Sequence, residues 1–393
     1  MYNTDLVNQL KNIPTPFYYY DINVLKSNLE SAINASSKYG YHIHYAIKAN
    51  ANPRILNIIQ GYGFGADCVS GNEVSKAVEH GFDSSKIAFA GVGKTDLEIN
   101  TSIDANISAF HVESVAELEV INELAGAKGK VVNVAFRLNP NVDAKTHAYI
   151  TTGLNENKFG INPWELEDLV KRCSSFANLK LIGIHFHIGS QITDMTVFEE
   201  LAIKVNSFMD WFEEKGIELP YINLGGGLGV DYENPSNKTP DFEAYFKAIH
   251  DNLKVRENQE IHFELGRSLV GTCGDLISKV LYIKNGLKKN FAIADAGMTD
   301  LLRPALYKSV HLVENLTSTL EGVVYDVVGP VCESSDVFAK DLTLPKTQRG
   351  DLLCIHTAGA YGQVMSSNYN LRDLAKAYYS DEVLSEGNPV KVA

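Results

Sequence analysis

The stretch Tyr45-Ala46-Ile47-Lys48 closes an apolar, strand-like run with a lysine, and Ala49-Asn50-Ala51-Asn52-Pro53 follows directly. Successive side chains of a strand point to opposite faces, and a charge at the end of a barrel strand lies at the mouth of the core. Taken alone, such a lysine is more often a surface residue. Whether Lys48 has a functional role depends on how many similar strands follow and on which side chains stand at their ends.

Apolar runs and segments of helical period alternate from about residue 41 to residue 268. Amphipathic stretches such as 115–125, 164–174 and 196–215 separate most of the runs. Eight βα units over roughly 230 residues predict a closed TIM-like (β/α)8 barrel. An open doubly wound sheet is the alternative, but no GxGxxG motif opens a helix after the first strand. The predicted strands are 41–48, 64–69, 86–91, 107–113, 131–139, 180–189, 221–225 and 261–266.

The pattern changes after residue 268. Short strand-like runs recur between turn residues, and helical periodicity is weak until 371–378, so an all-β domain, a β-sandwich or β-barrel, is predicted. Residues 17–21 also form a strand-like run, which we expect to pair with this sheet. We therefore predict a barrel domain of residues 22–262 and a β domain of residues 1–21 and 263–393. The C-terminal strand candidates are 276–283, 291–294, 322–328 and 351–356.

Bulk composition is that of a soluble globular enzyme, with 393 residues, 45% of them hydrophobic and 21% charged. The net charge of -13 argues against a nucleic-acid backbone or an anionic membrane as partner. No apolar run approaches ~18 residues, and the first residues lack the basic and apolar regions of a signal peptide. The five cysteines form no CxxC pair, which favours a reducing cytoplasm over a disulfide framework or a zinc cluster.

Polar residues gather where the predicted barrel strands end. Active sites of such barrels are built at the C-terminal ends of the strands, with phosphate held after strands 7 and 8. Each residue alone has an ordinary structural explanation, but their coincidence at the strand ends indicates a site. The set is Lys48, Asp67, Ser70, Glu113, Ser114, Arg137, Asn139, His185, His187, Ser190, Gly225, Gly226, Gly227, Glu264 and Arg267.

This set suits pyridoxal 5'-phosphate held as a lysine Schiff base. Lys48 supplies the amine, and the run Gly225–Gly227 offers backbone N–H groups and close approach for a phosphate. Glu264 is a carboxylate in an apolar run, so it must be paired; opposite the pyridine nitrogen it would keep that ring protonated. His187 could lie flat on the ring, although a hydrogen-bonded core histidine is about as good an explanation.

The chain resembles the fold-type III pyridoxal-phosphate decarboxylases, the alanine-racemase-like barrel group. Each motif is weak alone, but the ordered set is specific and covers nearly the whole chain. One departure is Leu265, where the family usually has proline. The motifs are 45–50 (YAIKAN), 158–160 (KFG), 185–191 (HFHIGSQ), 223–227 (NLGGG), 264–267 (ELGR), 295–307 (DAGMTDLLRPALY), 332–334 (CES) and 359–361 (GAY).

The resemblance implies a carboxy-lyase that converts meso-2,6-diaminopimelate to L-lysine and CO2, the last step of lysine biosynthesis. Lys48 would carry the cofactor, His187 would stack on its ring and Glu264 would pair with its nitrogen. Cys332 would be the acid at the carbanion, and the 332–334 segment would enter the partner subunit's site, so a homodimer with shared sites is implied. Cofactor binding is further implied for Ser190, Gly225, Gly226, Gly227, Gly266, Arg267 and Tyr361, and substrate binding for Arg267, Arg303, Tyr307, Glu333 and Tyr361.

Several alternatives stay open at this point. Carboxynorspermidine decarboxylase remains a lesser alternative. Another basic-amino-acid decarboxylase of the same fold, acting on ornithine or lysine, would form a diamine, which needs acidic groups alone and leaves no role for Arg303. A non-catalytic cofactor carrier with a single barrel is disfavoured by the chain length and by Cys332-Glu333-Ser334. A metal-dependent barrel hydrolase could use His185 and His187 on one strand face, but Lys48 and Glu264 would then be unexplained, so no metal is expected.

Overall fold

The computed structural model describes residues 2–143 and 158–383. The chain divides into two compact units. The barrel unit comprises Leu29–Gly229 and Asp241–Gly266, and the sheet unit comprises Met1–Asn28, Val230–Pro240 and Arg267–Ala393. The compact units divide at Asn28/Leu29 and Gly266/Arg267, and the segment 230–240 belongs with the sheet unit. The domain boundaries 21/22 and 262/263 drawn from the sequence remain a prediction.

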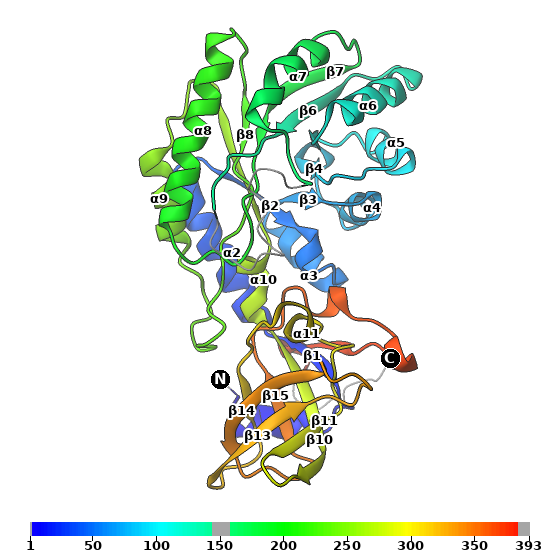
Figure 1. Ribbon diagram of the computed structural model, residues 1–393, viewed down its shortest axis with the longest axis vertical. Coiled ribbons are helices and arrows are strands. Elements are labelled where there is room, and N and C mark those ends of the chain that lie inside the picture. Colours follow the sequence, from blue (N-terminus) through cyan, green and yellow to red (C-terminus); the bar gives the residue numbers. More distant parts are fainter. Residues whose placement is uncertain (1, 144–157, 384–393) are drawn as a thin grey trace. The chain divides into compact units, whose positions relative to one another are not determined.

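The barrel unit is a closed barrel of eight strands, which confirms the (β/α)8 prediction (Figure 1). All neighbouring strands are parallel, and the barrel closes where His44 and Tyr45 pair with Glu264 and Leu265. Leu265, the departure from the family pattern, is fully buried there. The strands are β2 (His42–Ala46), β3 (Gly65–Cys68), β4 (Ile87–Phe89), β5 (Ala109–Val112), β6 (Val132–Arg137), β7 (Leu179–His185), β8 (Tyr221–Asn223) and β9 (Glu260–Leu265).

Helices surround this barrel, and their first turns explain several polar residues that follow the strands. Ser70 and Ser114 accept hydrogen bonds from the backbone N–H groups of Glu73 and Glu117, so they cap the next helices. The helices are α2 (Ile22–Ser37), which begins in the sheet unit, then α3 (Pro53–Gly61), α4 (Gly71–Glu79), α5 (Asp96–Asp104), α6 (Val115–Ala127), α7 (Leu166–Cys173), α8 (Thr196–Glu214) and α9 (Phe242–Asn252).

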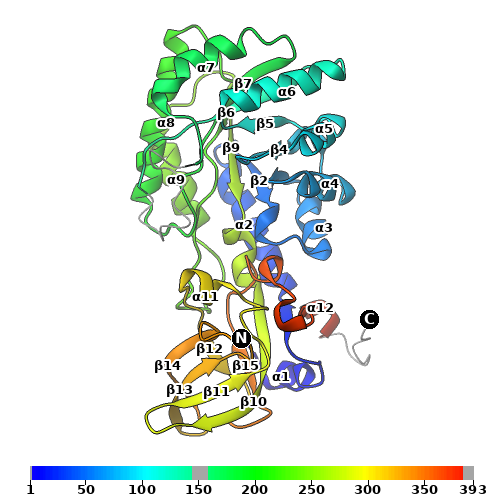
Figure 2. The same ribbon diagram turned by 45° about the vertical axis from the view of Figure 1, so that its right-hand side comes forward.

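The sheet unit contains one eight-stranded mixed sheet (Figure 2). Six strands run in the order β12-β15-β10-β11-β13-β14, and β1 pairs with β10 and β16, which confirms that residues 17–21 join the C-terminal sheet. The strands are β1 (Phe17–Tyr20), β10 (Gly274–Asn285), β11 (Asn290–Ala294), β12 (Val313–Asn315), β13 (Gly322–Val328), β14 (Val337–Pro345), β15 (Leu352–Ile355) and β16 (Lys376–Tyr379). The short helices are α1 (Thr4–Leu10), α10 (Arg267–Val270), α11 (Arg303–Tyr307) and α12 (Ser380–Val383).

The helical period predicted at 371–378 is wrong. Strand β16 occupies the second half of this stretch, and it pairs in parallel with β1 from the other end of the chain. The ring of Tyr378 packs edge-on against Phe17, with ring centroids 5.3 Å apart. Tertiary pairing therefore overrides the local pattern. Within the described ranges, no helix is both long and apolar enough to cross a membrane.

Candidate active site

Lys48 lies just beyond β2, in a short 3-10 turn of Ile47–Ala49, rather than in the strand itself as predicted. The turn is fixed because the Tyr45 hydroxyl donates to the backbone oxygen of Asn50 at 2.8 Å. The Nζ atom of Lys48 lies 2.5 Å from Oδ2 of Asp67, whose side chain in β3 is completely buried. The sequence placed Asp67 at a strand end but assigned it no role.

A cavity of about 410 Å³ opens next to Lys48 within the barrel unit. This volume lies in the range of small-molecule sites, roughly 300–1,000 Å³. A second lysine, Lys94, also lines the cavity, but its side chain is 1% exposed and donates to the oxygens of Gly91, His111 and Glu117. The cavity is lined by Lys48, Val69, Phe89, Ala90, Gly91, Val92, Gly93, Lys94, Glu98, Arg137, Phe159, His185, His187 and Glu264.

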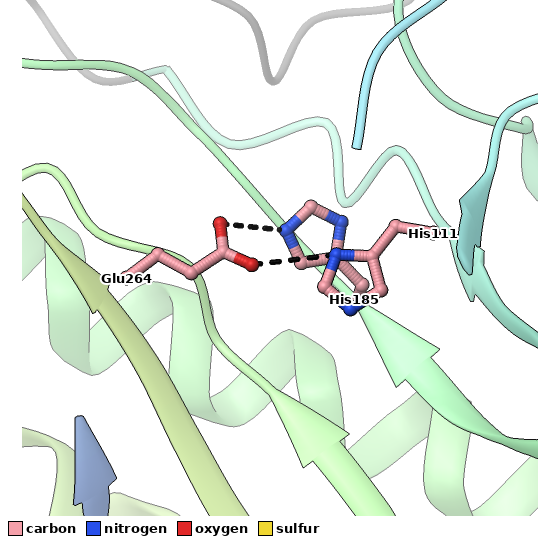
Figure 3. Close-up of side chains that lie close together, drawn as sticks. All are labelled: His111, His185 and Glu264. Atoms are coloured by element: carbon pink, nitrogen blue, oxygen red, sulfur yellow. Dashed lines mark hydrogen bonds and ion pairs between the residues drawn. The ribbon is translucent and has the colours of Figure 1, made fainter. Parts of the chain in front are cut away.

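Glu264 is a buried carboxylate surrounded by nitrogen atoms (Figure 3). Asn223 Nδ2 donates to its Oε1 at 2.9 Å, His185 Nε2 lies 3.1 Å from its Oε2, and His111 Nδ1 lies 3.3 Å from its Oε1. Desolvation raises the pKa of Glu264, and the positive charge of Lys48 opposes that rise. Burial lowers the pKa of both histidines well below the usual range, so both are neutral.

His111 escaped the sequence analysis, and His185 entered it only as a strand-end residue. Both are fully buried, and their rings stack with centroids 4.1 Å apart. The available signal was a histidine inside an apolar strand, since a buried polar group must be hydrogen-bonded. The metal alternative paired His185 with His187, but His185 instead groups with His111 and Glu264, one of two sets among the described residues whose atoms lie close enough to hold an ion.

His187 follows the end of β7 and lines the cavity, as its proposed stacking role requires. Desolvation, with the nearby charge of Lys48, lowers its pKa well below the usual range, so the ring is neutral. A neutral ring can lie flat against an aromatic cofactor without adding charge. The stacking itself remains a prediction, as does the phosphate contact of Ser190.

The three glycines after β8 allow backbones to approach closely. A Cβ on Gly225 would lie 2.1 Å from the oxygen of Phe186, and a Cβ on Gly226 would lie 2.0 Å from the oxygen of Glu264. Gly227 has a φ of +117°, which only glycine adopts readily. The barrel itself therefore requires these glycines, and their phosphate role remains a prediction. Gly266 packs similarly against the Lys48 turn, where an added Cβ would meet Ala49 at 3.0 Å.

Glu113 organises one wall of the cavity. Its Oε1 accepts from Arg137 Nη1 at 2.7 Å and from the backbone N–H of Gly91 at 3.1 Å, while its Oε2 accepts from the N–H of Gly160 at 3.0 Å. The Arg137 guanidinium lies 4.8 Å from the ring centroid of Phe159. One buried carboxylate thus joins three separate segments around the cavity.

Two buried arginines of the sheet unit share one tyrosine. Arg267 Nη1 donates to the Tyr232 hydroxyl at 2.7 Å, and the Arg303 guanidinium lies 4.7 Å from the centroid of the Tyr232 ring. The Arg267 guanidinium also lies 4.7 Å from the centroid of Tyr361, one of the predicted cofactor residues. Tyr232 was not predicted from the sequence, because it follows the glycine-rich segment in a stretch without strand or helix periodicity.

Arg303 is 4% exposed, and desolvation lowers its pKa. Its Nη1 lies 2.8 Å from His311 Nε2, and its Nη2 lies 3.3 Å from the Ser309 hydroxyl. Burial and the charge of Arg303 lower the pKa of His311 to about 3, so this histidine is a neutral acceptor. Among the residues that the structure describes, no carboxylate forms an ion pair with Arg303. A buried cation of this kind is suited to an anionic ligand.

Cys332 and Glu333 are exposed on the sheet unit. The backbone N–H of Cys332 donates to Asn370 Oδ1 at 3.2 Å, and the Tyr369 hydroxyl donates to Glu333 Oε1 at 2.9 Å. Asp336 fixes the same loop, because its carboxylate accepts from the backbone N–H groups of Val331 and Met298 at 2.7 and 2.6 Å. These contacts hold the loop in place, while the Cys332 thiol and the Glu333 carboxylate belong to exposed residues.

Comparisons with known proteins agree with this geometry. Residues 25–271 match the family described as pyridoxal-dependent decarboxylase, pyridoxal binding domain. The chain is 54% identical over 380 residues to the diaminopimelate decarboxylase of Bacteroides thetaiotaomicron, an alignment that covers 96% of this chain and 98% of that protein. It is 41% identical over 382 residues to the diaminopimelate decarboxylase of Aquifex aeolicus, covering 96% and 88%. It is also similar to the crystal structure of diaminopimelate decarboxylase from Helicobacter pylori complexed with L-lysine, with a TM-score of 0.90, 40% identity and coverage of 95% and 93%.

Proposed function

The chain belongs to the diaminopimelate decarboxylases within the pyridoxal-dependent decarboxylase family, and from that membership we propose how its own residues carry out the reaction. It decarboxylates meso-2,6-diaminopimelate to L-lysine and CO2 with pyridoxal 5'-phosphate. When bound, this cofactor accepts an amine at its aldehyde and withdraws electrons through its pyridine ring. The observation that carries the assignment of residues is the cavity that Lys48 and Glu264 line together.

The residues of the barrel unit fit the cofactor. Lys48 is the cavity lysine with an exposed side-chain fraction of 29%, whereas Lys94 is enclosed by three oxygen acceptors. Glu264 offers a carboxylate held by three nitrogen atoms, which suits a protonated ring nitrogen. His187 offers a neutral ring for stacking. Ser190, Gly225, Gly226, Gly227 and Gly266 are proposed to surround the phosphate end. Arg267 and Tyr361, which belong to the sheet unit, are proposed as further cofactor-binding residues.

The two charged ends of the substrate require opposite charges from the protein. We assign the remote carboxylate to Arg303, assisted by Arg267, Tyr307 and Tyr361, because Arg303 is a buried cation whose described contacts are neutral. Glu333 is assigned to the remote ammonium. A diamine-forming decarboxylase of lysine or ornithine would leave Arg303 without an anion, so these substrates are weaker alternatives. Carboxynorspermidine remains a lesser alternative.

We propose that the enzyme is a homodimer with shared active sites. Cys332, the proposed acid that protonates the α-carbon, is exposed, and the side chains of nearby Tyr369 and Leu371 are exposed as well. An acid that works on a desolvated carbon needs to be enclosed, and a partner subunit would provide that enclosure.

The five thiols are all unpaired, which supports a reducing compartment, the cytoplasm.

The function is tested by incubating the purified holoenzyme with meso-2,6-diaminopimelate and measuring CO2 release and L-lysine together. Equal yields of the two products are expected, and none from Lys48→Ala. A matched control is Lys38→Ala, which removes an exposed lysine directly after α2 in the same unit. Release of CO2 without L-lysine, or full activity in Lys48→Ala, would contradict the proposal.

A further inference from the structure

A connected group of buried polar side chains lies behind Glu264 in the barrel interior. Asn223 Nδ2 contacts both Glu264 Oε1, at 2.9 Å, and the Tyr221 hydroxyl, at 2.7 Å. The same hydroxyl lies 3.1 Å from His111 Nε2. His111 Nδ1 lies 3.3 Å from Glu264 Oε1, a close contact that does not have hydrogen-bond geometry. His185 Nε2 approaches the other carboxylate oxygen at 3.1 Å. All five side chains are buried, so each hydrogen must have a definite place.

The positions of these hydrogens follow from one fixed point, the orientation of the Asn223 amide. Its Oδ1 accepts the backbone N–H of Gly225 at 2.8 Å, so its Nδ2 must face Tyr221 and Glu264. The Tyr221 oxygen accepts from Nδ2, and the tyrosine's own hydrogen can then be donated to His111 Nε2, 3.1 Å away. A neutral histidine that accepts at Nε2 carries its hydrogen on Nδ1. That hydrogen is then on the ring nitrogen that lies 3.3 Å from Glu264 Oε1.

We propose that Tyr221 and Asn223 hold His111 in the Nδ1–H tautomer, so that three N–H groups, from Asn223, His111 and His185, keep Glu264 an ionised carboxylate oriented toward the cofactor ring. Tyr221, Asn223, His111 and His185 are then positioning residues that act through Glu264. The inference rests on the proposed pairing of Glu264 with the ring nitrogen and deepens it. It explains how a carboxylate that burial alone would neutralise retains its charge.

The same three side chains, His111, His185 and Glu264, could instead ligate a metal ion. That arrangement needs a lone pair on each facing nitrogen, since a metal ligand cannot carry a hydrogen at the ligating atom. The chain of donors from Gly225 through Asn223 and Tyr221 puts a hydrogen on the facing nitrogen of His111. The hydrogen-bond order therefore favours a carboxylate cradle over a metal site.

Neutron diffraction from crystals of the wild-type holoenzyme tests the proposed hydrogen positions directly. Deuterium is expected on His111 Nδ1, and the Tyr221 deuteron is expected to point at His111 Nε2. Deuterium on His111 Nε2, or a metal ion between the two histidines and Glu264, would overturn the proposal. This measurement does not depend on the activity of any variant.

Tyr221→Phe tests the consequence, because it removes one oxygen and keeps the ring that packs on His262. Without the hydroxyl, His111 can move its hydrogen to Nε2 and turn a lone pair toward Glu264. We expect kcat to fall about tenfold with KM little changed, because the ionised Glu264 loses one stabilising N–H group, that of His111. The nitrogen-15 signal of ring-labelled cofactor should move toward that of an unprotonated pyridine. Tyr245→Phe, in an equally buried tyrosine of α9, is the matched control and should change neither quantity.

Glu264→Gln separates failure of this inference from failure of the proposed function. If the nitrogen-15 signal moves in Glu264→Gln but stays in place in Tyr221→Phe, the group of positioning residues is wrong while the pairing of Glu264 stands. If it moves in neither variant, Glu264 is not the partner of the cofactor nitrogen, and both proposals fail. Movement in both variants, with Tyr245→Phe unchanged, is the result that supports the inference.

Discussion

The Nζ atom of Lys48 lies 2.5 Å from the completely buried carboxylate of Asp67. Burial, together with the charge of Glu264, raises the pKa of Asp67, and the charge of Lys48 opposes this rise. The positive charge of Lys48 thus interacts with two buried carboxylates, Asp67 and Glu264. Lys48 and Glu264 both line the cavity. This relationship places the proposed attachment point of the cofactor and the proposed partner of its ring nitrogen in the same small volume.

Glu264→Gln should keep the fold and lower kcat by about ten- to a hundredfold with a smaller change in KM. A neutral amide does not hold the proton of the cofactor ring, and a hydrogen bond to a charged group contributes roughly 1.5–3 kcal/mol. Steady-state kinetics on the reconstituted enzyme checks this. Glu260→Gln, at the exposed start of the same strand, is the control and should be unaffected. An unchanged kcat in Glu264→Gln would remove Glu264 from its assigned role.

Arg303→Ala should reduce the preference for meso-2,6-diaminopimelate over L-lysine. Lysine lacks the remote carboxylate, and leaving one member of a buried charge pair unpaired costs about 3–5 kcal/mol, so kcat/KM for lysine in the unaltered enzyme should be lower by roughly two to three orders of magnitude. The measurement compares kcat/KM for meso-2,6-diaminopimelate, L-lysine, L-ornithine and carboxynorspermidine. Arg349→Ala, an exposed arginine of the same unit, should leave the ratios unchanged. If another substrate equals diaminopimelate in the unaltered enzyme, the charge-matching argument is wrong.

Mixing the inactive variants Lys48→Ala and Cys332→Ala should restore part of the activity. Random exchange of subunits makes half of the dimers hybrid, and each hybrid has one intact site, so about a quarter of the normal activity is expected. Mixing Cys332→Ala with Glu333→Gln is the control, because both changes lie on one loop and no hybrid site is complete. Absence of recovery in the first mixture, with hybrid dimers detected by mass, would indicate sites built within one chain.

The stability contributed by His356 should decrease as the pH rises. Burial alone would lower the pKa of His356, but its contacts with Asp275, Cys354 and Glu314 outweigh this and raise it to about 12. Because the folded pKa lies above the unfolded value of about 6.5, this contribution is complete below pH 6.5 and is lost progressively toward pH 12. Each pH unit in that window removes up to about 1.4 kcal/mol.

The melting temperatures of the unaltered enzyme and His356→Gln check this prediction at about pH 6 and about pH 8.5. The difference between the two proteins should be larger at the lower pH. His80→Gln, which alters a half-buried histidine at the C-cap of α4, is the control. A difference that stays constant or grows with pH would show that His356 is not held in its charged form.

The structural elements that could be predicted from the sequence are mostly those with a periodic pattern. The eight barrel strands follow from regular alternation of apolar runs and helices, and Lys48 and Glu264 stand out as charges at the ends of such runs. His111 and Tyr221 were missed because a single polar residue inside an apolar strand has no periodic signal, and its partners come from other strands. Strand β16 was missed because its partner, β1, lies at the other end of the chain. The exposure of Cys332 also could not be predicted, since it depends on tertiary packing.

Borohydride reduction of the holoenzyme followed by peptide mapping tests whether Lys48 holds the cofactor. Reduction fixes the cofactor to the lysine that carries it, and mass spectrometry locates the added phosphopyridoxyl group. We expect the label on the peptide that contains Lys48 and its loss in Lys48→Ala. A label on another lysine, in particular on Lys94 in the same cavity, or no label at all on a protein that still decarboxylates its substrate, would contradict this role of Lys48.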